Sequence, residues 1–269
     1  DWLIMELSSY QLETAPEISP TIGIWTNLTP DHLERHKTLE TYSQIKRRLL
    51  ENSETCIYNG DDEFLKQHRA KSKQGIWVST KKGDSSNKQV DFWISETGMI
   101  IEKGKELFDS SVLEIPGNHN KQNLLMVTAA ARQIGLSGTA IHQSLMSFRG
   151  VPHRLEKLGN LHGIKIFNDS KATNYESAAM GISSVPATTV IIAGGQAKKG
   201  NTNKWLQQIN KSACGIVFFG ESGNYLKELV ISTNFKGVIK YCKNLNQAVN
   251  LAIEIALKRK AKSIIFSPA

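Results

Sequence analysis

The chain has 269 residues, 40% of them hydrophobic, and a formal net charge of +8, which fits one large or two medium globular domains. No apolar run approaches the roughly 20 residues that span a bilayer, and we recognise no signal peptide. The three cysteines have neither metal-ligand spacing nor an even count for disulfides, so we expect a cytoplasmic protein without a membrane partner.

The first 150 residues predict a mixed α/β domain. Apolar runs predict buried or half-buried strands at residues 2–7, 21–28 and 54–59. Helical spacing appears at residues 41–52 and 120–134, the second ending at Gly135 as its C-cap. Residues 90–115 alternate in polarity and contain Gly98 and Gly104, which predicts antiparallel hairpins.

A second αβ series begins after Gly150. Its expected strands lie at residues 164–167, 189–193, 216–219 and 263–266, with helices between them, for example at 245–257. Strands alternating with helices favour a mostly parallel sheet covered on both faces. We therefore predict two α/β domains, 1–150 and 151–269, with ligands at the carboxyl ends of their strands.

Three residues of the first domain suggest a metal site. Glu6 opens ELSSYQLE at the end of an expected strand, His32 follows Asp31 in NLTPDHLERH, and Lys46 lies one turn after Tyr42. A carboxylate suits Mg²⁺, imidazole binds metals, and a buried lysine with a lowered pKa can react with carbon dioxide to give a carbamate. Taken singly, each has a simpler interpretation as a surface Glu, an ordinary His beside a capping Asp, or a solvated Lys.

In this order the three segments resemble the central domain of the Mur ligases, the ATP-dependent acid–amino-acid ligases of peptidoglycan synthesis. The resemblance implies two magnesium ions, held by Glu6, His32 and a carbamylated Lys46. Arg47 is adjacent, and a register error of one residue would exchange it with Lys46. The Tyr-x-x-x-Lys spacing favours Lys46.

Two further segments are implied to contact ATP. PGNHNKQN precedes a helix, where its polar side chains can also serve simply as caps. The resemblance places Asn120, Asn123, and His153 and Arg154 of the PHR triplet at the ATP base and phosphates. An arginine suits a phosphate whose charge grows during transfer.

NDSKATN follows the expected strand 164–167 and is the most discriminating segment. Asp169 would position ATP or its magnesium, and Lys171 and Thr173 offer a cation and a hydroxyl to a substrate carboxylate. The alternative is a polar loop in which Ser170 or Thr173 caps the next helix, and both can hold together. The implied catalytic set is Lys46, His32, Arg154 and Asp169.

Two more residues are implied to bind the incoming amino acid. GGQAKKG, residues 194–200, lacks the dinucleotide-binding fingerprint. The resemblance places Lys198 there, with Lys199 as the fallback, facing the carboxylate of the amino acid. Ser267 of FSPA is the second contact that the resemblance implies.

Within the family, NDSKATN and SSYQLE resemble the branch that adds D-glutamate to UDP-N-acetylmuramoyl-L-alanine. The Tyr-Ala-His and Asn-Pro-Arg segments of the diamino-acid-adding relatives are not found. The implied enzyme would form an acyl phosphate with ATP, and we expect it to be a monomer. A folylpolyglutamate-type or other Mur-type ligase with a different acceptor is the alternative. A nucleic-acid-binding module, suggested only by charge, lacks a basic stripe with interleaved aromatics.

The family also needs a phosphate loop of the G-x-x-G-K-[ST] kind, and no such segment is present. The chain begins with Asp1 inside an expected strand and stops just after another. We therefore expect a piece truncated at both ends. Loss of one preorganised donor alone costs roughly 2.7–4 kcal/mol, so residues 1–269 by themselves should be essentially inactive.

Overall fold

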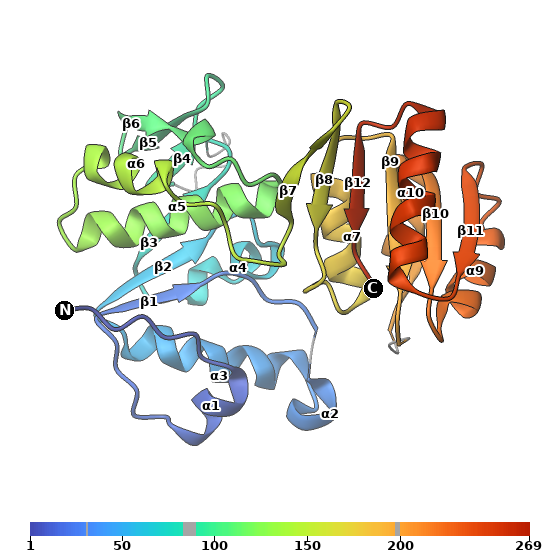
Figure 1. Ribbon diagram of the computed structural model, residues 1–269. Helices are drawn as coiled ribbons and strands as arrows, with labels where there is room; N and C mark the ends of the chain where they lie inside the picture. The colour runs from blue at the N-terminus through green and yellow to red at the C-terminus, as the bar shows by residue number, and fades with distance from the viewer. Residues whose placement is uncertain (31, 83–89, 197–199) are drawn as a thin grey trace. The chain divides into compact units, whose positions relative to one another are not determined.

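The computed structural model describes residues 1–30, 32–82, 90–196 and 200–269 (Figure 1). Its internal contacts divide the chain into two compact units. Unit 1 comprises Asp1–Leu113 and Asn118–Phe148, and unit 2 comprises Glu114–Gly117 and Arg149–Ala269. The boundary predicted near Gly150 lies beside the end of unit 1.

The sheet of unit 1 has the order β1-β2-β3-β4-β5-β6. Strands β1 to β4 pair in parallel, and β4 to β6 form antiparallel hairpins, which confirms the prediction for residues 90–115. Gly98 and Gly104 take positive φ angles of 89° and 87° in the two turns, a conformation that glycine adopts without strain. The strands are Ile22–Trp25, Thr55–Asn59, Ile76–Ser79, Phe92–Ile94, Met99–Glu102 and Lys105–Asp109.

Helices cover both faces of this sheet. On one face Leu124 and Leu125 of α5 pack with Ile57, Val78 and Ile100 from the strands. On the other, Tyr42 and Leu50 of α3 pack with residues that include Trp25, Cys56, Tyr58 and Trp77. The helices of unit 1 are α1 Ser9–Thr14, α2 Leu33–His36, α3 Leu39–Asn52, α4 Glu63–Gln67, α5 Asn118–Gln133 and α6 Gly138–Met146, with 3₁₀ turns at Arg69–Lys71 and Ser110–Val112.

The strand predicted at residues 2–7 is wrong. The segment has no regular secondary structure, and Trp2, Leu3, Ile4 and Met5 are 59%, 82%, 94% and 58% exposed. An apolar run becomes a strand only where a neighbour satisfies its backbone groups. Within the described residues β1 is the edge strand of the sheet and pairs only with β2. Residues 2–7 therefore have no strand partner within that part of the chain.

The sheet of unit 2 has the order β11-β10-β9-β12-β8-β7 and is parallel except for the pairing of β7 with β8. Side chains alternate between its faces: Ile191 packs toward α7, α8 and α9, and its neighbours Val190 and Ile192 pack toward α10. The strands are β7 Glu156–Leu161, β8 Ile164–Asn168, β9 Thr189–Gly194, β10 Ala213–Phe219, β11 Val238–Cys242 and β12 Ser263–Phe266, and the helices are α7 Tyr175–Ser184, α8 Asn203–Ser212, α9 Gly223–Ile231 and α10 Leu245–Arg259.

The predicted fold class is therefore confirmed: both units are α/β, with mostly parallel sheets and small antiparallel parts. All three cysteines are free thiols. Across the part of the chain that the structure describes, each helix is too short or too polar to cross a membrane.

Candidate active site

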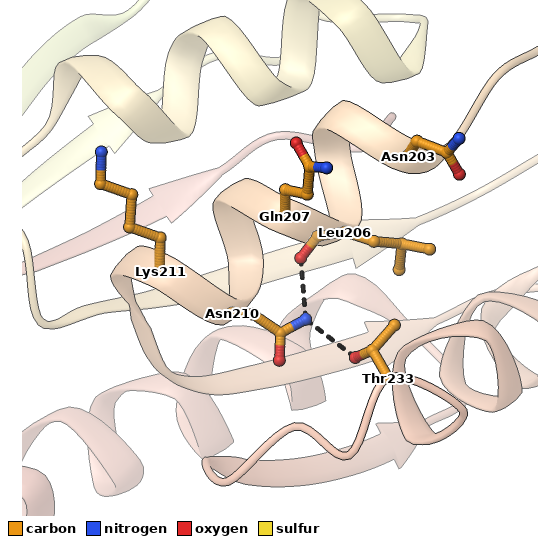
Figure 2. A pocket seen from close by; sticks show the side chains of 6 residues that line it. All are labelled: Asn203, Leu206, Gln207, Asn210, Lys211 and Thr233. Carbon is orange, nitrogen blue, oxygen red and sulfur yellow. Dashed lines mark hydrogen bonds between the residues drawn. The ribbon is translucent and has the colours of Figure 1, made fainter.

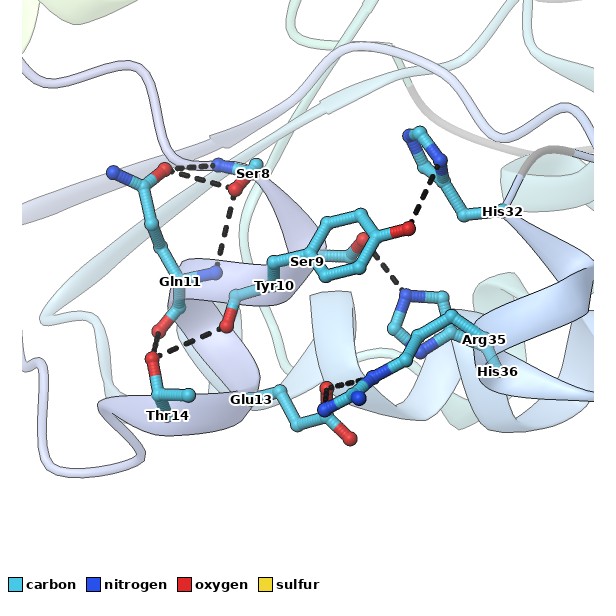
Figure 3. A network of polar contacts seen from close by, with 9 residues as sticks. All are labelled: Ser8, Ser9, Tyr10, Gln11, Glu13, Thr14, His32, Arg35 and His36. Carbon is cyan, nitrogen blue, oxygen red and sulfur yellow. Dashed lines mark hydrogen bonds and ion pairs between the residues drawn. The ribbon is translucent and has the colours of Figure 1, made fainter.

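Helices α1 and α2 meet through Tyr10 and His32 (Figure 3). The Tyr10 hydroxyl lies 3.4 Å from His32 Nδ1, and the two rings meet edge to face with centroids 5.1 Å apart. His32 is the N-cap of α2 and has a left-handed backbone, with φ of 54°. This backbone turn presents its imidazole toward the ELSSYQLE segment.

Helix α3 brings Tyr42 and Lys46 to the same place. The buried Tyr42 ring lies edge to face with His32, at a centroid distance of 6.4 Å. Lys46 lies one helical turn later, and its Nζ lies 5.1 Å from the Tyr42 ring centroid, a cation–π arrangement. Arg47 is directed elsewhere and donates from Nη1 to the Lys71 carbonyl at 3.4 Å.

His36 is a residue of this cluster that the sequence reasoning missed. It is 3% exposed, its Nε2 hydrogen-bonds Ser9 Oγ at 2.9 Å, and its ring stacks on Tyr42 with centroids 5.4 Å apart and an angle of 13°. It therefore joins α1, α2 and α3. The available signal was its position four residues after His32, on the same face of a helical turn.

The fit of this cluster to magnesium is incomplete. Glu6 is exposed in the irregular segment before α1, and Asp31 lies outside the described residues. Among the residues that the structure describes, no three His, Cys, Asp or Glu side chains gather as a metal site. Because Mg²⁺ prefers oxygen ligands, His32 and Lys46 suit it only with a carbamylated Lys46 and a carboxylate such as Glu6.

The N-terminus of α5 is tied to the carboxyl ends of β2 and β3. Gln122 Nε2 donates to Asp61 Oδ2 at 3.3 Å, and the same carboxylate oxygen accepts the Thr80 amide and hydroxyl at 2.8 and 2.7 Å. Asn120 and Asn123 flank Gln122 in this anchored turn, and Asn123 is exposed. The geometry fixes the turn on which the predicted ATP contacts lie.

In unit 2 the PHR and NDSKATN segments are joined by hydrogen bonds. Asn168 Nδ2 donates to His153 Nδ1 at 2.9 Å, and the Lys171 amide donates to the His153 carbonyl at 3.0 Å. His153 has a left-handed backbone, with φ of 67°, and the Arg154 side chain is exposed. Two segments predicted as separate motifs therefore lie side by side at the carboxyl end of β8.

Asp169 and Ser267 are buried side chains that bond to each other. Asp169 is 7% exposed and Ser267 is 0% exposed, and Ser267 Oγ donates to Asp169 Oδ2 at 3.1 Å. The Leu155 amide donates to Asp169 Oδ1 at 3.1 Å. Burial raises the pKa of the Asp169 carboxyl to about 6, and these two hydrogen bonds and the charge of Arg154 oppose the rise.

The other amino-acid contacts lie on the surface or outside the described residues. Lys171 and Thr173 are exposed. Neither Ser170 nor Thr173 caps α7: the cap is Asn174, whose side chain accepts the Ser177 amide at 2.8 Å. Lys198 and Lys199 fall outside the described residues, so the structure does not locate their side chains.

A shallow cavity of about 570 Å³ lies elsewhere in unit 2 (Figure 2). Asn210 spans part of it, donating to the Leu206 carbonyl at 2.9 Å and the Thr233 hydroxyl at 2.8 Å. Its lining residues are Asn203, Leu206, Gln207, Asn210, Lys211 and Thr233. None of them belongs to the motifs described above, so we do not include this cavity in the site.

Comparison with known proteins identifies relatives of this chain. Residues 1–131 match the Mur ligase middle domain, which places this part of the chain in the Mur ligase family. It is 52% identical over 269 residues to a UDP-N-acetylmuramoylalanine–D-glutamate ligase of Prochlorococcus marinus (strain MIT 9313), covering 100% of this chain and 58% of that protein. The protein of that name from Synechococcus sp. (strain CC9605) is 48% identical, with the same coverage.

Solved structures of Mur ligases share the fold. The UDP-N-acetylmuramate-alanine ligase of Thermotoga maritima superposes with a TM-score of 0.67 at 19% identity, over 94% of this chain and 57% of that one. A MurF ligase of the same organism in complex with ADP gives 0.64 at 17% identity, over 96% and 60%. The chain thus spans somewhat more than half the length of the relatives it matches.

Proposed function

We propose that this chain is the ATP- and amino-acid-binding part of a ligase that adds D-glutamate to UDP-N-acetylmuramoyl-L-alanine. The observation that carries the proposal is the 52% identity, along the whole chain, to a relative named for that reaction. The joined PHR and NDSKATN segments support it, because they place a cluster of ligand-type side chains at strand ends, where α/β sheets bind ligands.

In unit 2, Arg154 and His153 would contact the ATP phosphates. Lys171 and Thr173, both exposed beside this loop, would hold the D-glutamate carboxylate together with Lys198. Such contacts orient the amine for attack, a positioning contribution to rate. The resemblance also gives Asp169 and Ser267 ligand contacts, but their burial favours the supporting role argued below.

In unit 1, Asn120 and Asn123 would contact ATP. Glu6, His32 and carbamylated Lys46 would hold magnesium, which neutralises phosphate charge when bound. Lys46 lies over the Tyr42 ring, which also contacts His32, whereas Arg47 is directed toward Lys71, and this supports the choice of Lys46.

The reaction would proceed in two steps. The terminal carboxylate of UDP-N-acetylmuramoyl-L-alanine attacks the γ-phosphorus of ATP, giving an acyl phosphate and ADP. The amine of D-glutamate then attacks the acyl carbon, phosphate leaves, and the amide bond forms. We further propose that the protein is a monomeric, cytoplasmic enzyme of cell-wall synthesis with no nucleic-acid partner. A related ligase with another acceptor, including a folylpolyglutamate type, is the second candidate.

The test is amino-acid-dependent ADP release by the full-length gene product, with UDP-N-acetylmuramoyl-L-alanine and either D-glutamate, L-glutamate or a diamino acid. We expect turnover with D-glutamate alone. Lys171→Ala should lower kcat/KM by on the order of 10²-fold, because a charged partner of the carboxylate is lost. Lys165→Ala is the control: Lys165 is also an exposed lysine but lies in β8, and its removal should leave activity unchanged. Equal turnover with L-glutamate would overturn the proposal.

The 269-residue chain by itself provides a second test. Residues 1–269 alone should show no ATP-dependent ligation, because they contain no phosphate loop. Measurable turnover by this piece would contradict the expectation.

A further inference from the structure

We propose that Asp169 and Ser267 are positioning residues that fasten the PHR segment to NDSKATN and thereby set the ATP and amino-acid contacts together. This rests on the proposed function for its kinetic consequences. The fastening itself rests on the contacts of unit 2 alone, so the two parts can be tested separately.

The first step is the position of the Asp169 carboxylate between three segments. Its Oδ1 accepts the amide of Leu155, directly after PHR, and its Oδ2 accepts the hydroxyl of Ser267, directly after β12. Its own amide donates to the Phe266 carbonyl at 2.8 Å. Both carboxylate oxygens are thus used inside the protein, and Ser267 is 0% exposed. Side chains so placed are suited to hold backbone rather than to bind a ligand.

The second step is the close packing of α7 against the same carboxylate. A Cβ added at Gly181 would lie 2.1 Å from Asp169 Oδ2, so any other residue there would displace the carboxylate. Gly181 is in mid-helix, where glycine is destabilising by roughly 0.5–1 kcal/mol relative to alanine. Its presence at this point is explained by the space that Asp169 occupies.

The third step concerns the loop that contains the PHR segment and Leu155, which the Asp169 hydrogen bond holds in place. Leu155 has a left-handed backbone, with φ of 49°, so its loop is not in a relaxed conformation. The His153 carbonyl accepts the Lys171 amide at 3.0 Å, which links the loop to the amino-acid side of the site. Release of the Asp169 bond would therefore let Arg154 and Lys171 shift together. One buried pair would control contacts to two substrates.

A structural measurement tests the fastening without any substrate. In the 269-residue chain, Ser267→Ala and Asp169→Asn should speed hydrogen exchange of the Leu155 amide at least tenfold. Ser263→Ala is the matched control: Ser263 is also buried in β12, at 0% exposure, and donates to the Pro186 carbonyl at 2.8 Å. It should leave Leu155 exchange unchanged. Equal Leu155 exchange in Ser267→Ala and Ser263→Ala would overturn the fastening.

Gly181→Ala is a second variant that alters neither motif. It should speed Leu155 exchange by displacing the carboxylate, although alanine favours the helix. Gly138→Ala, where a new Cβ meets nothing nearer than 3.4 Å, should not. Unchanged Leu155 exchange in Gly181→Ala would also overturn the fastening.

Kinetics of the full-length gene product then test the consequence. We expect Ser267→Ala and Asp169→Asn to raise KM for ATP and for D-glutamate together, each about five- to tenfold, with the Ser263→Ala values unchanged. A rise confined to ATP would show that Asp169 is a direct ATP contact instead. An inactive wild-type protein would sink the proposed function and leave the exchange result standing.

Discussion

The candidate ligand-binding residues of unit 1 and those of unit 2 are held by different physical means. In unit 1, aromatic and imidazole rings gather His32 and Lys46 around Tyr42. In unit 2, the buried carboxylate of Asp169 accepts hydrogen bonds from the Leu155 amide and the Ser267 hydroxyl. Ring contacts tolerate a range of distances and angles, whereas a hydrogen bond weakens steeply with misalignment. We therefore expect the first cluster to tolerate small displacements that the second does not.

The largest effect should come from Lys46. Lys46→Arg keeps the charge over the Tyr42 ring but cannot form the same carbamate, so activity of the full-length protein should fall by about 10²–10³-fold. Arg48→Ala, an exposed residue of α3, is the control. Mass spectrometry under bicarbonate should find the carbon dioxide adduct on Lys46. Full activity of Lys46→Arg would exclude the carbamate role.

The pH dependence of stability should come next, because burial raises the pKa of Asp169 to about 6 from 3.8. The folded state then holds a proton between these values that the unfolded state releases. The free energy of unfolding should accordingly fall as pH rises from about 4 to about 6, by at most about 3 kcal/mol. Chemical denaturation across this range should show a flatter profile for Asp169→Asn. An unchanged profile would mean that the carboxyl does not titrate in this window.

His36 should give the clearest stability effect in unit 1. His36→Ala removes the Tyr42 stack and the Ser9 hydrogen bond, and should lower the free energy of unfolding by about 2 kcal/mol. His68 is the comparison: it stacks on Phe64 at 4.0 Å but is only half-buried, so His68→Ala should cost about 1 kcal/mol or less. His36→Phe should recover the stacking part. A loss no greater than that of His68→Ala would show that the cluster is not held through His36.

Much of this fold could be predicted from sequence because the signals were local. In unit 2, β12 was predicted with its observed bounds, and β8, β9 and β10 with small shifts at their ends. Their β-branched and aromatic runs face helices on both sides. The strands β7 and β11, at the two edges of that sheet, were missed. Charged residues interrupt their apolar runs, as Lys240 does in β11, and their side chains are mostly not buried. Pairing with an inner strand defines them.

The contacts at the candidate site could not be predicted because they join residues that are distant in the sequence or depend on tertiary packing. Asp169 and Ser267 stand 98 positions apart, so no spacing rule reveals their hydrogen bond. His36 looks like a surface histidine until the packing of α1 and α3 buries it. Residues 2–7 have the composition of a strand, but a strand also needs a neighbour. The sequence motifs identify candidate ligand-binding residues. Tertiary contacts distinguish exposed side chains, which are available to a ligand, from buried ones, which hydrogen-bond to neighbouring segments.

The smallest effect should be at Tyr10, and it tests the tolerance of the ring cluster directly. The Tyr10 hydroxyl is 3.4 Å from His32 Nδ1, long for an O–H···N bond, and the residue is 40% exposed. Tyr10→Phe keeps the edge-to-face contact at 5.1 Å and should change the free energy of unfolding by less than about 0.5 kcal/mol. Ring nitrogen resonances of His32 should report an unchanged ring position. A loss above about 1 kcal/mol would mean that the hydrogen bond, rather than ring packing, holds His32, and the contrast between the two units would disappear.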